Sequence, residues 1–323
     1  MKQYIFEQQH EKFWHDFEEV VTSFEKNKPS TNAQEFARQY RIACQHVAQA
    51  SSRNYSPSLI EDLQHLIERA HHVLYRHSTP ILSQFVQWLR YDLPANVRAE
   101  KKMVIWAHLL FYVPFFVMML FCAIFPDLAE RLLGSWHTSM MDRMYEDMAE
   151  RTRDGENRDF GINMLMFGYY IFNNVGIAFK TAGSGFLFGV GTLYILLFNG
   201  FMIGSVFGHM LHNDIEVAAA FFGFVSTHGA FELTGIVLSG AAGLRIGLAL
   251  IDPQGYSRMD ALKIQGKSAA KLITAAFFLL VIAAFFEAFW SSMGMIPPVV
   301  KIFVATFCWI GVYVYLFRVG KKK

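Results

Sequence analysis

The chain has 323 residues, of which 53% are hydrophobic and only 17% are charged, and its mean hydropathy is +0.25. An ordinary soluble protein carries charge on about a quarter of its residues, so this composition excludes that class and indicates a membrane protein. The net charge of +2 gives no reason to expect a nucleic-acid partner, and three widely spaced cysteines form neither a disulfide framework nor a CxxC metal motif.

Charged residues are concentrated in residues 1–101, where apolar residues recur at helical spacing in FARQYRIACQHVAQA (36–50) and LIEDLQHLIERAHHVLYRH (59–77). This region is predicted to be a cytoplasmic helical domain, and its polar start predicts no signal peptide. An amphipathic helix is expected at its end, over residues 80–92. Two placements stay open for that helix, the membrane interface or the surface of the soluble domain.

Membrane-length apolar runs dominate residues 102–320, which form the predicted transmembrane domain. Each run is long enough to cross a hydrocarbon core of about 30 Å. A further apolar segment over residues 161–180 contains three asparagines and leaves the number of spans at five or six. The clear runs are 103–125, 183–211, 217–250, 270–290 and 297–317.

The charges between these runs favour six spans. Residues 126–160 hold five arginines against nine acidic residues, a net charge of −4, whereas the 251–271 loop has a net charge of +2 and the chain ends in three lysines. Basic short loops and tails stay in the cytoplasm. With six spans the acidic segment 126–160 is external and both termini are cytoplasmic. The sequence therefore predicts an all-α bundle of about six transmembrane helices in a bacterial inner membrane.

The stretch THGAFELTGIVLSGAAGLRIG places His228 and Glu232 one helical turn apart among apolar and small residues. An ionised carboxylate at mid-membrane costs about 2.5–3.5 kcal/mol, so it has to be neutral, paired or hydrated. The expected topology adds Glu287 from the following span, and His209 and His212 from the preceding one, towards the outer half of the membrane. These five residues are the candidate ligand or proton site. His228, Glu232 and Glu287 are also the candidate ligands of a metal ion such as zinc.

Small residues recur at every fourth position in two of the spans. In lipid such rows let helix backbones approach closely. We expect the two helices to cross tightly, with each other or with a symmetry mate, and the second possibility predicts a homodimer. The rows are Gly200, Gly204 and Gly208 in one span and Gly235, Ser239 and Gly243 in the next.

Three successive stretches carry a family resemblance, namely FGYYIFNNVGIAFKTAGSGFLFGVGTLYILLFNGFMIG, THGAFELTGIVLSGAAGLRIG and AAFFEAFWSS. In this order they resemble the signatures of the stage II sporulation protein M family. The start of the chain, with KFWHDFEEVV, is similar to the longer bacterial members of that family. The resemblance implies a role in the cell envelope, since the namesake works in forespore engulfment beside proteins that degrade peptidoglycan.

Three functions remain open at this point. The resemblance favours a non-enzymatic assembly or scaffold component that works with other membrane or cell-wall proteins, with the His/Glu cluster as a polar clasp that fixes helix register. The cluster could instead serve a transporter or channel for an ion, a proton or a lipid. A metal-dependent intramembrane hydrolase is the third possibility, but a catalytic zinc needs three protein ligands and HGAFE supplies two.

Overall fold

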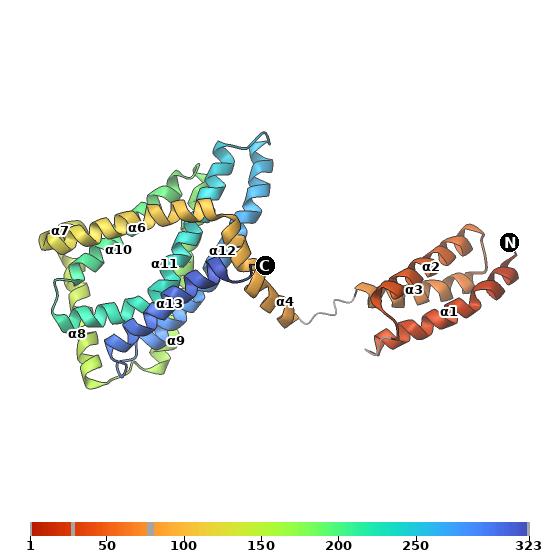
Figure 1. Ribbon diagram of the computed structural model, residues 1–323, viewed down its shortest axis with the longest axis horizontal. Helices are drawn as coiled ribbons and strands as arrows, with labels where there is room; N and C mark the ends of the chain where they lie inside the picture. Colours follow the sequence, from red (N-terminus) through yellow and green to blue (C-terminus); the bar gives the residue numbers. More distant parts are fainter. Residues whose placement is uncertain (1, 27–29, 76–80, 322–323) are drawn as a thin grey trace. The chain divides into compact units, whose positions relative to one another are not determined.

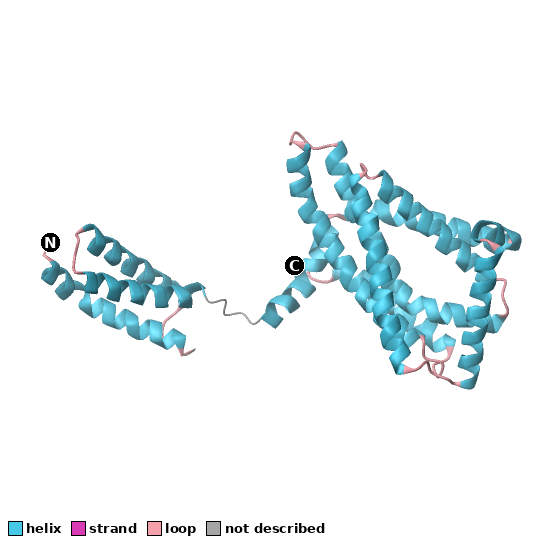
Figure 2. Cartoon of the chain, turned by 180° about the vertical axis from the view of Figure 1, so that it is seen from behind, coloured by secondary structure: helices cyan, strands magenta, loops and turns pink. Residues whose placement is uncertain are grey.

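The computed structural model describes residues 2–26, 30–75 and 81–321, and these residues form helices joined by loops, without a strand (Figure 1, Figure 2). The expected all-α class is therefore confirmed. The chain divides into two compact units, Met1–Gln84 and Phe85–Lys323.

Three helices build the first unit: α1 (Gln3–Glu25), α2 (Ala33–Ser52) and α3 (Pro57–Tyr75). The side-chain oxygen of Asn32 begins α2 by accepting a hydrogen bond of 2.8 Å from the backbone N–H of Glu35, a donor that the helix itself leaves free. The apolar faces of the three helices meet in two clusters. One contains Phe17, Val21, Phe36, Ala43, Leu66 and Ala70, and the other contains Phe6, Ala50, Tyr55 and Leu63.

In the second unit, six helices are long and apolar enough to cross a membrane, which confirms a multi-pass protein with six candidate spans. The expected run 183–211 is divided by a bend, because the helix before it continues through a 3-10 turn to Phe186. Gly189 begins the next helix with φ +80°, a left-handed conformation that suits glycine. The spans are α6 (Lys101–Ile124), α9 (Phe160–Gly183), α10 (Val190–Met210), α11 (Ile215–Ile251), α12 (Arg258–Phe285) and α13 (Pro298–Arg318).

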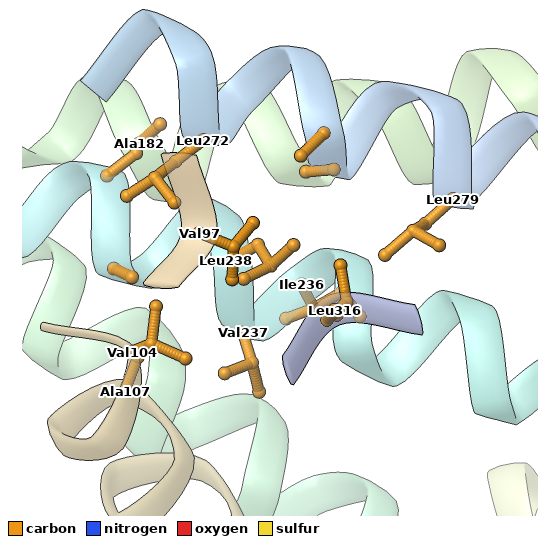
Figure 3. Packing of buried hydrophobic residues seen from close by; sticks show 14 of the residues in the cluster. Val97, Val104, Ala107, Ala182, Ile236, Val237, Leu238, Leu272, Leu279 and Leu316 are labelled. Atoms are coloured by element: carbon orange, nitrogen blue, oxygen red, sulfur yellow. The ribbon is translucent and has the colours of Figure 1, made fainter. Parts of the chain in front are cut away.

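Helix α11 lies at the centre of this unit and packs against α6, α9, α10, α12 and α13. Most of its residues are buried, whereas only a small share of α9 and of α13 is buried. The apolar core around α11 is drawn in Figure 3, where Ile236, Val237 and Leu238 of α11 belong to the same cluster as Leu272 and Leu279 of α12. An apolar helix that is buried nearly all round belongs to the interior of a bundle.

Both rows of small residues are used for packing within the chain. A Cβ atom at Gly200 or Gly204 would overlap a backbone carbonyl of α6, so the row of α10 faces α6 and not α11. The row of α11 faces other helices, since Gly235 lies against Leu280 of α12 and Gly243 against Thr192 of α10. The small residues therefore allow helix backbones of the same chain to pack closely, as helix association in lipid requires.

The acidic segment expected outside the membrane forms two helices, α7 (Pro126–Leu133) and α8 (Ser135–Asp154). Helix α8 packs on α11, where the rings of Tyr145 and Phe221 meet edge to face with centroids 5.0 Å apart. The segment is thus part of the folded unit and covers one side of α11.

The end of the predicted domain 1–101 packs on the transmembrane unit from Phe85 onward, so the boundary between the two compact units lies between Gln84 and Phe85. This stretch comprises the end of α4 (Ile81–Gln87), a π-helical turn over Trp88–Asp92 and α5 (Leu93–Ala99). Leu93 and Val97 are buried in the main apolar core, and Arg98 donates hydrogen bonds to backbone carbonyls beyond the end of α13 and in its last turn. Residue 80, the expected start of the amphipathic helix, and the last two lysines of the chain lie outside the described residues.

The close approach of α10 to α6 predicts that Gly204→Ala destabilises the protein. The new methyl group would overlap the Phe115 carbonyl, which belongs to the backbone of α6 and cannot rotate away. We expect a loss of about 1–3 kcal/mol, measured by unfolding in a detergent titration. Gly311→Ala in α13 is the control, because a Cβ there meets open space, and it should be neutral or stabilising by up to about 1 kcal/mol.

The first unit is predicted to lose stability in mild acid through His46. Burial, reinforced by the charge of His10, lowers the pKa of His46 from 6.5 to about 4, and its Nδ1 accepts a hydrogen bond of 3.0 Å from Trp14 Nε1 only while the ring is neutral. The unfolded chain binds this proton more readily, so the contribution is complete above pH 6.5 and is lost as pH falls towards 4.

Hydrogen exchange of α1 and α2 in the full chain, corrected for intrinsic rates, measures this effect and should accelerate between pH 7 and pH 4.5. His46→Gln keeps an acceptor for Trp14 but does not titrate, so its exchange should change less over the same interval. Equal acid sensitivity in the two proteins would contradict the assignment to His46.

Candidate functional site

Three ionisable side chains meet where α11 passes the end of α12. His228 and Glu232 lie on the same face of α11, because residues four apart are neighbours on a helix. Glu287 reaches them from a π-helical turn, Phe286–Ser291, that continues α12. One ligand atom from each of the three residues lies within 4.8 Å of the others, and we call this group the triad.

The three side chains of the triad satisfy only part of one another's hydrogen-bonding capacity. His228 Nε2 lies 3.9 Å from Glu232 Oε2, which is beyond hydrogen-bond distance, and His228 Nδ1 lies 3.3 Å from Ser291 Oγ. The imidazole is 6% exposed, while Glu287 Oε2 is buried and has no hydrogen-bond partner among the described residues. A buried carboxylate oxygen without a donor is costly, so this group has unused capacity to bind a cation or a proton.

A cavity of about 460 Å³ adjoins the triad and is lined by residues of α8, α9, α11, the π-helical turn and α13. Glu287 and Ser291 belong to the lining as well as to the surroundings of His228, so the triad borders this cavity, which we call the polar cavity. Its other polar lining includes Lys301, Arg158, Arg151, Asp147, Tyr145, Tyr170 and Ser292.

The structure separates the other two candidate histidines from the triad. His209 Nε2 lies 2.8 Å from Asp142 Oδ1, which also accepts a hydrogen bond from the Asn213 side chain, so this contact joins α10 to α8. His212 Nε2 lies 3.1 Å from the Cys122 carbonyl oxygen at the end of α6. Among the described residues neither histidine belongs to a metal-sized group.

Two cations of the polar cavity were not selected from the sequence. Lys301 lies near the start of α13 and looks like one charge inside an apolar run, which gives no indication of its neighbours. Arg158 precedes α9 and was counted only among the charges of the acidic segment. The position of Lys301 within a predicted span could have indicated this site, since charged residues inside spans mark polar sites in membrane proteins.

The fold and this site define a multi-pass membrane protein with a polar centre inside its helix bundle. Residues 103–292, more than half of the chain, match the family described as Stage II sporulation protein M, and the chain belongs to that family. The resemblance seen in the three sequence stretches is therefore confirmed. Residues 5–76, which cover α2, α3 and nearly all of α1, match a family described as Domain of unknown function (DUF8413).

A curated relative covers part of the same chain. Uncharacterized protein MJ0793 of Methanocaldococcus jannaschii is 28% identical over 123 residues, which is 36% of this chain and 66% of that protein. The match thus spans slightly less than two thirds of the relative. No solved structure matches the chain significantly.

Proposed function

We propose that this membrane protein binds a divalent cation, zinc above all, at His228, Glu232 and Glu287. The observation that carries the proposal is the buried Glu287 oxygen without a partner, within a group of three ligand atoms at most 4.8 Å apart. A purely structural clasp would use its polar atoms on one another, whereas His228 and Glu232 stand 3.9 Å apart.

Zinc suits this donor set because it accepts imidazole nitrogen and carboxylate oxygen at about 2.0–2.2 Å in tetrahedral geometry. Three protein ligands leave the fourth position open, and Glu287 places the group at the edge of the polar cavity. The Ser291 hydroxyl can accept a hydrogen bond from His228 Nδ1–H, which directs Nε2 towards the carboxylates and supplies the outer partner that metal-bound histidines have. An open position supports ion passage or metal-assisted hydrolysis, and a proton held by the two carboxylates is the competing occupant.

We further propose that the protein works as an assembly component in the envelope of a bacterial cell, beside other membrane or cell-wall proteins. Family membership supports this role, and a compact three-helix unit outside the spans supplies a surface for partners. The loop charges support an inner-membrane location with both termini in the cytoplasm. A homodimer would have to form through other surfaces than the small-residue rows, which are buried within one chain.

The cation site predicts about one zinc ion per chain in protein purified without chelators, measured by elemental mass spectrometry. Glu232→Gln and Glu287→Gln each remove a charged ligand and should lower the zinc content to less than about a tenth. Glu216→Gln is the matched control on α11, because its side chain is 66% exposed and lies outside the triad.

For each sample we also measure the mass of the intact protein–detergent complex, which gives the oligomeric state, and the melting temperature. Zinc that is absent from the wild type, or equally present in all four proteins, would contradict the cation site. A Glu232→Gln protein that changes its oligomer mass without any metal in the wild type would favour the structural clasp.

The proposed topology predicts opposite labelling of two cysteines placed in a background without Cys44, Cys122 and Cys308. Ser139→Cys in α8 should react with a membrane-impermeant maleimide in intact cells. Lys263→Cys in α12, where the native side chain is 70% exposed, should react only after permeabilisation. The reverse pattern would place both termini outside the cell.

A further inference from the structure

We propose that the polar cavity binds the phosphate group of an anionic ligand through Lys301 and Arg158. This goes beyond the cation site, because it concerns two side chains that are not ligands of the triad. It is carried by the buried ammonium of Lys301 and the partly buried guanidinium of Arg158, which line one cavity and form no ion pair within the described residues.

Lys301 is only 3% exposed, and the one hydrogen bond of its ammonium runs to the Ser291 carbonyl oxygen at 2.8 Å. Within the described ranges no carboxylate oxygen lies within 4.0 Å of Nζ. The backbone holds this residue in place, since the Lys301 carbonyl accepts a hydrogen bond from Thr227 Oγ1 of α11 at 3.1 Å. An ammonium has three donors, and burying it without a counter-charge is costly.

Arg158 approaches the same cavity from the segment before α9. Among the described residues, its buried guanidinium nitrogen Nη1 has no hydrogen-bond partner and no carboxylate forms an ion pair with the side chain. Its neighbours fix the backbone on both sides: Asn157 bridges to Met293, and Asp159 caps α9 by accepting from the N–H of Gly161 at 2.8 Å. A guanidinium held in this way presents its donors in a fixed direction, which suits phosphate oxygens.

The negative groups of the cavity compensate these two cations only in part, since Glu287 attracts Arg158 without forming an ion pair with it. Asp147 lies on the same wall but forms an ion pair of 2.8 Å with Arg151. Glu287 is the remaining carboxylate of the lining, and in the proposed function it holds the cation. Lys301 and Arg158 then offer two positive charges to the oxygens of a phosphate group, and the volume of about 460 Å³ leaves room for the group that carries it.

Such a phosphate group can belong to a lipid headgroup or to a soluble phosphate. Three walls of the cavity, α9, α11 and α13, are candidate membrane spans, which gives a lipid headgroup a route from the bilayer. The recognition chemistry is the same for both sources, so the experiment separates them.

Full-length protein is reconstituted into nanodiscs of equal parts phosphatidylcholine and phosphatidylglycerol, and the lipids it retains on release are counted by native mass spectrometry. Inorganic phosphate alone is titrated into the detergent-purified protein by calorimetry. The wild type should retain phosphatidylglycerol selectively or bind inorganic phosphate. Lys301→Gln and Arg158→Gln should each weaken the binding about tenfold or more, because each removes charge-assisted hydrogen bonds.

Arg153→Gln is the matched control, because this arginine of α8 is 62% exposed, pairs with Glu216 and does not line the polar cavity. Lipid retention without phosphate binding assigns the site to a headgroup, and the converse assigns it to a soluble phosphate.

Arg158 lies outside the spans, so Arg158→Gln still tests the inference if Lys301→Gln does not fold. Metal is measured in the same samples, so loss of phosphate with retained metal separates this site from the triad. Wild-type protein that binds neither probe, or variants that bind as well as the wild type, would overturn the inference.

Discussion

The polar groups that α11 carries into the bilayer need partners inside the protein, and this requirement organises the transmembrane unit. Lipid offers no hydrogen bonds, so these groups turn towards neighbouring helices. Thr227 donates to the Lys301 carbonyl of α13, the Ser226 carbonyl accepts from Trp309 of the same helix, and His228 meets Ser291 after α12. These contacts lie within one turn of α11. They hold α11 against α13 and against the π-helical turn after α12, where the triad and the polar cavity form.

Small residues make this arrangement sterically possible. Helices in lipid gain little from burying apolar surface and associate through close packing instead. Gly235 lets α12 approach α11 close to Glu232. The glycine row of α10 packs instead against the backbone of α6. The packing therefore brings Glu287 to α11, while its Oε2 finds no donor among the described residues. This unused acceptor beside His228 and Glu232 is the basis on which we propose a ligand site.

The class, the six spans and the family could be predicted from the sequence, because apolar length, loop charge and three motifs are local properties. The meeting of His228 and Glu232 follows from helical spacing, and that of Glu287 from the order of the spans. Lys301 and Arg158 could not be predicted, since their meeting depends on how the segments before α13 and α9 fold back onto the bundle. Spacing every fourth residue likewise predicts a packing face without naming the partner helix. Sequence order placed His209 near the triad, whereas its contact with α8 depends on its direction around α10.

X-ray absorption spectroscopy of the zinc-loaded protein tests the central claim most directly, because it reports the atoms that surround the ion. The account predicts one imidazole nitrogen and carboxylate oxygens at about 2.0–2.2 Å, and it predicts that this signal is lost in Glu287→Gln, which retains little zinc. A sulfur shell at about 2.3 Å, or two or more imidazoles, would show that zinc binds elsewhere in the chain and would contradict the assignment to His228, Glu232 and Glu287.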